Sequence, residues 1–425
     1  MPTPTATRAT AARATPNTRS ATKPKQPAAA AVAPKRTQAK VAPTPTPTPA
    51  PASPPAPAPT AAPRAREVGV RLSQALEMAG LADDRERFAQ LMVDRPRSDT
   101  YHRIYSGADL RHVRLALLEQ AGITAPAGAA PGPALIPVYM AKGGVGKTAV
   151  AANVAVCLAQ HGYATLLIDA DPQSGTATNL FRVDASDGVP ITHLGHLLDA
   201  HGDAADPRRA IVSIYADGML DLIPADDTLA AANLSLVNRP WREQVFAKYL
   251  AEHAEAFAAY DAIVLDTGAA ISPLNTAILN AAPRHFVAPV TLDGQVIKAT
   301  STLATQMARL NAGRTADLTP VIVANGYSDR PVARAALARL ATEYGPLLCR
   351  RMIPHSPAFG RQFSLDAADE AHMPVIEREP SSAAARAMVD LTRALIPLFG
   401  VRLGGISDPR FELTALPAQA SAALV

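Results

Sequence analysis

The chain has 425 residues and a formal net charge of +4, from 41 Lys/Arg and 37 Asp/Glu. No apolar stretch approaches the roughly 18 residues that a membrane-spanning helix needs. Two cysteines are too few for a disulfide framework or a four-thiolate iron–sulfur site within one chain. Because the N-terminus lacks the apolar segment of a secretory signal, we expect a cytoplasmic protein; an organelle transit peptide is the alternative.

Residues 1–66 differ in composition from the rest of the chain. They carry ten Lys/Arg and no Asp or Glu, and Pro, Ala and Thr dominate. Such a segment has few large apolar groups to bury, so we predict that it is disordered, with polyproline II character over 43–49. Without it the chain has 31 Lys/Arg and 37 Asp/Glu, a net charge of −6. The segment is either a basic arm that binds nucleic acid or a solubilising linker.

Residues 67–123 are predicted to form a small helical module. Apolar residues recur at helical spacing, as at Leu72, Leu76 and Ala79, and Gly80 and Gly122 are suited to end helices. The arginines of the module are Arg85, Arg87, Arg95, Arg97, Arg103, Arg111 and Arg114. The module is either a helix-turn-helix unit that contacts DNA or a dimerisation or packing element with a charged outer face. The Ala-, Gly- and Pro-rich residues 124–133 are predicted to be a linker.

Apolar runs and helical patterns alternate over residues 134–400, which we predict to be one domain. Strands are predicted over 135–140, 164–168, 219–223, 262–265, 285–290 and 320–324. Helices are predicted over 148–160, 226–238, 241–259, 296–310, 332–343 and 382–398. This alternation indicates an α/β fold, a mainly parallel twisted sheet with helices on both faces. Residues 401–425 are predicted to be a flexible C-terminal tail.

A glycine-rich loop joins the first predicted strand to a helix: residues 141–148 read Ala-Lys-Gly-Gly-Val-Gly-Lys-Thr. Glycines let backbone N–H groups approach phosphate oxygens, a lysine binds the β- and γ-phosphates, and a Ser/Thr hydroxyl binds Mg²⁺. The predicted nucleotide-binding residues of this loop are Gly143, Gly144, Val145, Gly146, Lys147, Thr148 and Ala149. Lys142 is not required by this chemistry, and the extra cation suggests a nucleotide site shared between two subunits.

Three aspartates follow two other predicted strands. Ligands of open α/β sheets bind at the carboxyl ends of strands, so we expect these carboxylates beside the glycine loop. Asp169 and Asp171 are spaced by two and point the same way on an extended segment, so that one could hold the Mg²⁺ shell and the other orient water. Asp266 ends an apolar run and is suited to hold Mg²⁺, directly or through water.

These motifs together resemble those of the ParA-type partition ATPases, in the deviant Walker A group that includes the MinD-like proteins. The three motifs are residues 142–148, residues 168–173 (Ile-Asp-Ala-Asp-Pro-Gln) and residues 260–267 (Tyr-Asp-Ala-Ile-Val-Leu-Asp-Thr). The likeness covers about residues 134–398, and residues 1–133 lie outside the shared core.

The resemblance implies a role for each motif residue. Lys142 would cross a dimer interface to the partner's phosphates, Lys147 would bind the β- and γ-phosphates in its own subunit, and Asp171 would orient the hydrolytic water. The residues that would hold or support Mg²⁺ are Thr148, Asp169 and Asp266. Asn325 and Pro354 resemble family positions near the adenine.

The resemblance also implies a function. The chain would be a slow, partner-stimulated ATPase that uses ATP and Mg²⁺, forms a homodimer on binding ATP, and binds DNA nonspecifically on the nucleoid. A centromere-binding ParB-like adaptor would stimulate hydrolysis, and no membrane contact is expected. The candidate DNA contacts are Arg330, Arg334, Arg350, Arg351 and Arg361.

Three alternatives stay open. A MinD-like membrane-cycling ATPase needs a basic amphipathic anchor, which residues 401–425 do not resemble. A DNA-binding regulator would use nucleotide only as a structural ligand. A reductase that carries an iron–sulfur cluster across a dimer needs paired cysteines, and Cys157 and Cys349 lack a ligand spacing.

Overall fold

The computed structural model describes residues 65–95, 104–125, 132–172, 176–183, 190–199, 202–293, 296–363 and 373–412. All of them fall within one compact unit, Pro57–Val425. The predicted disordered segment 1–66 lies outside the described residues except for its last two, as do residues 126–131 of the predicted linker and residues 413–425.

An eight-stranded sheet forms the centre of this unit, in the order β3-β4-β2-β5-β1-β6-β7-β8. The strands are β1 (Ala134–Val138), β2 (Thr165–Ala170), β3 (Val212–Ser213), β4 (Leu220–Ile223), β5 (Ala262–Thr267), β6 (His285–Thr291), β7 (Thr319–Tyr327) and β8 (Ile353–Pro354). Neighbouring strands are parallel except for β3, which pairs antiparallel with β4. The predicted α/β fold is therefore confirmed, with β3 and β8 as short additions at the two edges.

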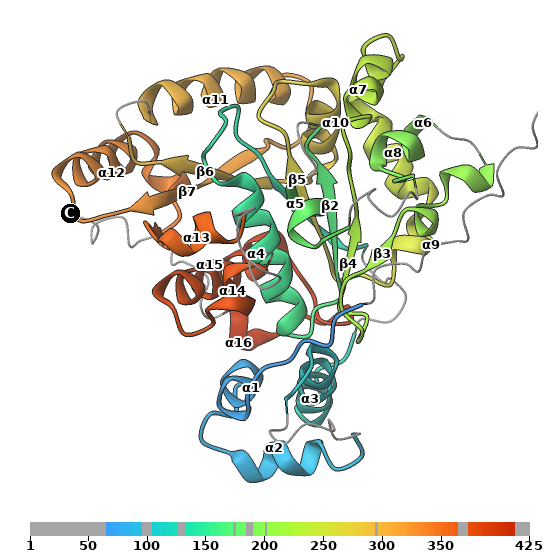
Figure 1. The fold of residues 1–425 in the computed structure, drawn as a ribbon, viewed down its shortest axis with the longest axis vertical. Coiled ribbons are helices and arrows are strands. Elements are labelled where there is room, and N and C mark those ends of the chain that lie inside the picture. The colour runs from blue at the N-terminus through green and yellow to red at the C-terminus, as the bar shows by residue number, and fades with distance from the viewer. Residues whose placement is uncertain are drawn as a thin grey trace, which may run out of the picture. The chain divides into compact units, whose positions relative to one another are not determined.

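Helices cover both faces of the sheet (Figure 1). The helices of the described residues are α1 (Leu72–Ala79), α2 (Arg85–Leu91), α3 (Gly107–Gln120), α4 (Lys147–Gln160), α5 (Thr176–Leu180), α6 (Leu194–Asp199), α7 (Leu229–Val237), α8 (Val245–Glu252), α9 (Ala254–Phe257), α10 (Pro273–Ala281), α11 (Val296–Asn311), α12 (Pro331–Tyr344), α13 (Pro357–Arg361), α14 (Val375–Arg378), α15 (Ala383–Phe399) and α16 (Pro409–Glu412). Of these, α1, α2 and α3 lie beyond one end of the sheet rather than on its faces.

Alternate residues of the strands supply apolar cores on the two faces of the sheet. On one face Leu167 and Val264 pack under α4, α14 and α15, and Figure 1 shows α4 beside α15. On the other face Leu166 and Ile263 pack under α6, α7, α8 and α10, and the strands nearer β8 pack under α11 and α12. Because strands with both faces covered must be apolar throughout, they appear in the sequence as continuous apolar runs.

The prediction of one continuous helix over 241–259 is wrong. The structure has a short 3₁₀ turn over Arg242–Gln244, then α8, then α9, with His253 as the last cap of one helix and the first cap of the next. Trp241 precedes this run in a left-handed conformation with φ of 55°, which an uninterrupted helix excludes. The sequence prediction also missed α10, whose start is capped by the Ser272 side chain.

Three helices occupy the predicted helical module, and Gly80 and Gly122 both have positive φ just after a helix, at 71° and 72°. Two arginines of α3, however, face the sheet domain. Arg111 pairs with Asp261, and Arg114, which is fully buried, donates to Asp408 at 2.9 Å. Placing these two on a DNA-binding surface is therefore wrong, because each neutralises a carboxylate next to the sheet.

The predicted C-terminal tail starts too early. Val401 and Leu403 are buried, and Asp408 accepts from both Arg114 and Arg410. These contacts hold residues 401–412 against the sheet domain and α3, so that only residues 413–425 remain as a predicted tail, outside the described residues. No helix in the described part of the chain is long and apolar enough to cross a membrane.

Candidate nucleotide site

The glycine loop lies between the carboxyl end of β1 and the start of α4. Gly144 and Gly146 have φ of 70° and 89°, a conformation that side chains other than glycine rarely adopt. A Cβ on Gly143 or Gly144 would meet nothing within 4 Å, so the loop has open space on its outer side. A Cβ on Gly146 would clash with the Asn325 amide. The loop therefore presents backbone N–H groups and a helix start to an open face.

Lys147 is the buried cation of the site. Burial lowers the pKa of Lys147, while the nearby carboxylates of Asp266 and Asp171 act in the opposite direction. Its Nζ donates to the backbone carbonyl of Lys142 at 3.3 Å. The ammonium therefore lies in the loop of its own subunit, as a lysine that binds phosphates in cis requires.

The Lys142 side chain is held at the outer edge of the loop. Its Nζ lies 3.0 Å from a carboxylate oxygen of Asp293, just after the end of β6, and 3.4 Å from the Thr291 hydroxyl. The exposed fraction of the side chain is 24% for Lys142 and 48% for Asp293. The two lysines thus have different positions, one in the loop and one at its outer edge.

Asp266 is fully buried at the end of β5, and neither of its carboxylate oxygens has a hydrogen-bond partner among the described residues. Burial and then repulsion from Asp169 raise the pKa of Asp266 well above its usual range. The nearby Thr148 hydroxyl acts in the opposite direction and lowers that pKa. A buried carboxylate without partners is costly, so this one is suited to a cation or to ordered water.

Asp169 differs from Asp266, because both of its carboxylate oxygens accept hydrogen bonds from the protein. Its Oδ2 accepts from both the backbone N–H and the hydroxyl of Thr178, at 2.9 and 2.8 Å, and its Oδ1 accepts from the backbone N–H of Asp171 at 3.2 Å. Burial raises the pKa of Asp169 to about 6, and these hydrogen bonds oppose the rise. Asp169 therefore fixes the loop that carries Asp171, and metal support by Asp169 stays a prediction.

Asp171 leaves the end of β2 toward the start of the loop after β5. A Cβ on Gly268 would lie 3.1 Å from the Asp171 carboxylate, so the glycine is what allows this approach. Asp169 and Asp266 are register partners on neighbouring strands. The structure thus brings the three predicted aspartates together at the carboxyl edge, beside Lys147.

Asn325 lies against the glycine loop, where its amide donates to the Val145 carbonyl at 2.8 Å. Pro354 lies on β8, paired with Tyr327 of β7. The residues that follow each of them, Gly326 and His355, line a hollow of about 410 Å³. The other residues lining it are Leu292, Asp293, Ser328, Arg330, Val332 and Ala333. The hollow is lined by Asp293, which pairs with Lys142, but by neither Asn325 nor Pro354, so an adenine beside these two residues stays a prediction.

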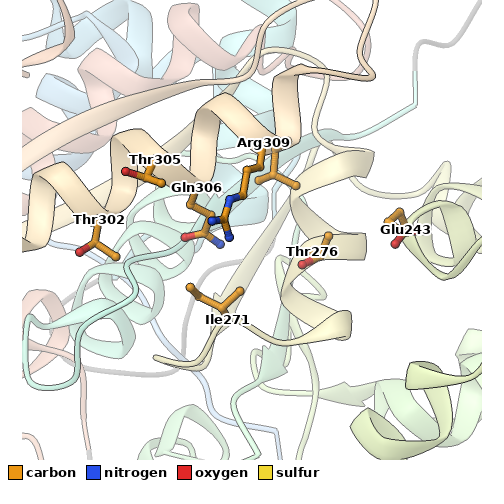
Figure 2. A pocket seen from close by; sticks show the side chains of 8 residues that line it. Glu243, Ile271, Thr276, Thr302, Thr305, Gln306 and Arg309 are labelled. Carbon is orange, nitrogen blue, oxygen red and sulfur yellow. The ribbon is translucent and has the colours of Figure 1, made fainter. Parts of the chain in front are cut away.

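A second hollow, of about 460 Å³, lies between α10 and α11 (Figure 2). Figure 2 shows Thr302, Thr305, Gln306 and Arg309 along α11, with Thr276 of α10 facing them. None of the predicted site residues lines it, so it is separate from the glycine loop.

Two site residues were not predicted from the sequence. Thr178 of α5 donates a hydrogen bond to Asp169, and Asp293 pairs with Lys142. Asp293 follows a predicted strand, so the strand-end argument that selected Asp169 and Asp266 could have found it. The role of Thr178 depends on how α5 folds back onto β2, and no local signal marks it.

The donor set fits a nucleotide with Mg²⁺. The loop offers open backbone N–H groups and Lys147 for phosphates, and the partnerless Asp266 with the Thr148 hydroxyl offers oxygen ligands. No three His, Cys, Asp or Glu side chains form a metal cage in the described ranges. Mg²⁺ characteristically takes one or two protein ligands and completes its shell with phosphate and water oxygens.

The chain is similar in sequence to a known family model and to known partitioning and cell division proteins. Residues 134–318 match a family model described as an AAA domain. The chain is 31% identical to a chromosome-partitioning ATPase Soj of Thermus thermophilus, over 52% of this chain and 83% of that protein. It is 30% identical to the cell division protein PomZ of Myxococcus xanthus, over 59% and 74%.

Solved structures agree on the fold. A cobyrinic acid a,c-diamide synthase from Mycobacterium smegmatis, with bound ATP analogue and magnesium, superposes with a TM-score of 0.50 at 23% identity. The superposition covers 63% of this chain and 96% of that one. Both cysteines of this chain are buried.

Proposed function

Since the chain belongs to the ParA-type family of P-loop partition ATPases, we propose that it is an ATP-dependent switch for DNA segregation. It binds ATP and Mg²⁺ at the glycine loop, dimerises on ATP and binds DNA nonspecifically. Hydrolysis, stimulated by a ParB-like adaptor, returns it to the monomer. ATP stabilises the dimer only as far as it interacts more strongly with that state.

The position of Lys142 is the observation that carries the proposal. Lys147 already serves the loop of its own subunit, whereas Lys142 lies at the outer edge, on a partly exposed pair with Asp293. A lysine in that place can reach phosphates bound by a second subunit. It would stabilise charge on the transferring phosphoryl group as an arginine finger does. Asp171 would orient the water, and Asp266 with Thr148 would hold the metal.

Exposed arginines outside the helical module support the DNA part of the proposal. Arg330, Arg334, Arg351 and Arg361 are exposed, and Arg350 is half-buried. They lie around α12, β8 and α13, which are consecutive in the chain. Arg334 and Arg361 have acidic neighbours, Asp329 and Glu379, so the pairs must open if these two arginines contact phosphates.

Replacing Lys142 tests the proposal. Lys142→Ala should bind ATP with normal affinity, because Lys147 is intact, but should lose ATP-dependent dimerisation and most of its turnover, by roughly 10³-fold or more. Lys248→Ala, which removes an exposed lysine paired with Glu252, is the matched control. The measurements are ATP affinity, turnover with and without DNA, and mass in solution. Normal dimerisation and turnover in Lys142→Ala would refute the assignment.

A further inference from the structure

Arg66 is the last residue of the basic segment 1–66, and its contacts show that the prediction of disorder over 1–66 is wrong for this residue. Its backbone forms a parallel bridge with Tyr215 next to β3: the Arg66 N–H donates to Ile214, and its carbonyl accepts from Ala216, both at 2.9 Å. Its guanidinium reaches Glu377 of α14 with two N–H groups, at 2.8 and 3.4 Å. The residue is therefore fixed by both backbone and side chain.

Glu377 depends on this cation. Only 5% of its side chain is exposed, and besides Arg66 it accepts from the Tyr215 hydroxyl. An ionised carboxylate at this depth is stable only when paired, because its desolvation is costly. The buried ion pair with Glu377 therefore holds the Arg66 side chain in place.

The same guanidinium lies over the ring of Phe181, 5.7 Å from its centre, and at 5.9 Å from the ring of Tyr215. Phe181 is buried and directly follows the short helix α5. The next residue, Arg182, has φ of 58°, a left-handed conformation that costs a non-glycine residue free energy. A five-residue helix with such an end depends on its surroundings to hold its shape.

Helix α5 in turn holds Asp169 and Asp171 at the carboxyl end of β2. Thr178, three residues before Phe181, donates twice to Asp169, which accepts from the N–H of Asp171. The Thr178 hydroxyl also accepts from the backbone of Ala225. A continuous set of contacts therefore runs from Arg66 to Phe181, through α5 to Thr178, and on to Asp169 and Asp171.

We propose that Arg66 is a positioning residue for ATP hydrolysis: by seating Phe181 and α5, it fixes the Thr178–Asp169 contact that orients Asp171. The inference rests on the proposed function for the identity of the reaction. It assigns a task in catalysis to a residue far from the glycine loop and outside the family's shared motifs. Among the described residues, Arg66 has no hydrogen bond or ion pair with the glycine loop or with any of the three aspartates.

The route leads to Asp171, which would orient the water, rather than to the glycine loop that would bind the nucleotide. A second path leads from α14 to the glycine-loop helix, since Ile376 donates to Asn153 of α4. However, α4 is buried from Ala149 to Gln160, with its own packing against β5 and α15. Loss of Arg66 should therefore lower kcat and leave the KM for ATP nearly unchanged.

Steady-state ATP hydrolysis by the full chain, with Mg²⁺ and double-stranded DNA, tests this split. Arg66→Ala should lower kcat roughly 10-fold or more with KM within about 2-fold, since a displacement far from the chemistry can cost up to about 100-fold in rate. Arg66→Lys, which keeps the cation, should recover part of the loss. Arg64→Ala removes the same charge from the basic segment and should leave both constants unchanged.

Two further variants separate seating of Phe181 from neutralisation of Glu377. Phe181→Leu keeps the Arg66–Glu377 pair but removes the ring, and should lower kcat as Arg66→Ala does. Arg66→Ala with Glu377→Gln removes the unpaired buried charge and should stay slow. Full kcat in Phe181→Leu, or recovery of kcat in the double variant, would overturn the inference.

Amide hydrogen exchange gives a readout that does not depend on activity. Arg66→Ala, but not Arg64→Ala, should speed exchange at the amides of Thr178 and Val183, which donate to Asp169 and to Thr178. Faster exchange in a protein without any ATPase activity would refute the proposed function and support the contact route. Unchanged exchange together with unchanged kcat would refute the route alone.

Discussion

The two ends of the parallel strands treat buried charge in opposite ways. At the amino end, Arg111 pairs with Asp261, and the fully buried Arg114 pairs with Asp408, so the helical module is joined to the sheet domain by satisfied ion pairs. At the carboxyl end, the buried carboxylate of Asp266 has no hydrogen-bond partner in the described part of the chain. At the amino end, other residues of the chain neutralise the buried charges. At the carboxyl end, a buried carboxylate is left to bind a ligand.

The difference distinguishes stabilising charges from functional ones. Removing one partner of a buried pair leaves an uncompensated charge, so pairs such as Arg114–Asp408 stabilise the fold. A buried carboxylate without a partner lowers stability, and its raised pKa expresses that cost. The following predictions test this contrast, from the largest expected effect to the smallest.

Asp266→Asn should abolish hydrolysis and stabilise the fold. Turnover should fall by roughly 100-fold or more, because a charged ligand for the metal is lost. The pKa of Asp266 is raised in the folded state, so the unfolded chain loses this proton at lower pH, and the wild type loses stability as pH rises through the raised value. The thermal midpoint of Asp266→Asn without nucleotide should therefore exceed that of the wild type, by more at pH 8 than at pH 5.

Asp227→Asn, at an exposed position, is the control for this substitution. A lower thermal midpoint in Asp266→Asn at pH 8 would mean that the carboxylate stabilises the fold, contrary to the contrast drawn here.

Arg114→Ala should destabilise the amino end severely. Breaking a buried ion pair costs about 3–5 kcal/mol, and we expect the lower part of that range because Arg410 still donates to Asp408. Arg334→Ala, which breaks an exposed pair with Asp329, should cost less than about 1 kcal/mol. Denaturant unfolding of both variants measures the difference, and equal losses would contradict it.

Substitution of the exposed arginines should separate the proposed DNA surface from the helical module. Arg351→Ala should weaken DNA binding and reduce the slope of log K against log salt by about 1 if it contacts a phosphate. Arg87→Ala in α2 should leave the slope unchanged. Its side chain donates to Gln120, and acidic residues Asp84 and Glu86 lie beside it. The reverse result would move the DNA surface to the module.

Asp293→Asn should have the smallest effect. The Lys142–Asp293 pair is partly exposed, and such pairs contribute about 0–1 kcal/mol. Releasing Lys142 should therefore lower the ATP concentration needed for dimerisation by roughly 2- to 5-fold, as measured by light scattering. Weaker dimerisation in Asp293→Asn would show that Asp293 assists Lys142 rather than restraining it.

The carboxyl end was more predictable from the sequence than the amino end. The glycine loop and the aspartates Asp169, Asp171 and Asp266 are local motifs at strand ends, and strand order brings them together. The partner of Arg114 is 294 residues away, so no local pattern could indicate that this arginine is buried. The burial of Leu403 in the predicted tail was missed for the same reason, because it depends on residues that are far away in the sequence.

The central claim is that Lys142 acts on the nucleotide of a second subunit, and mixing two inactive variants tests it directly. Lys142→Ala keeps Asp171, and Asp171→Ala keeps Lys142. In an equal mixture, a mixed dimer would contain one complete site, assembled from both chains. The account predicts that turnover recovers, to about a quarter of the wild-type rate when half of the dimers are mixed, since each mixed dimer has one working site. No recovery in a mixture that forms mixed dimers would contradict it.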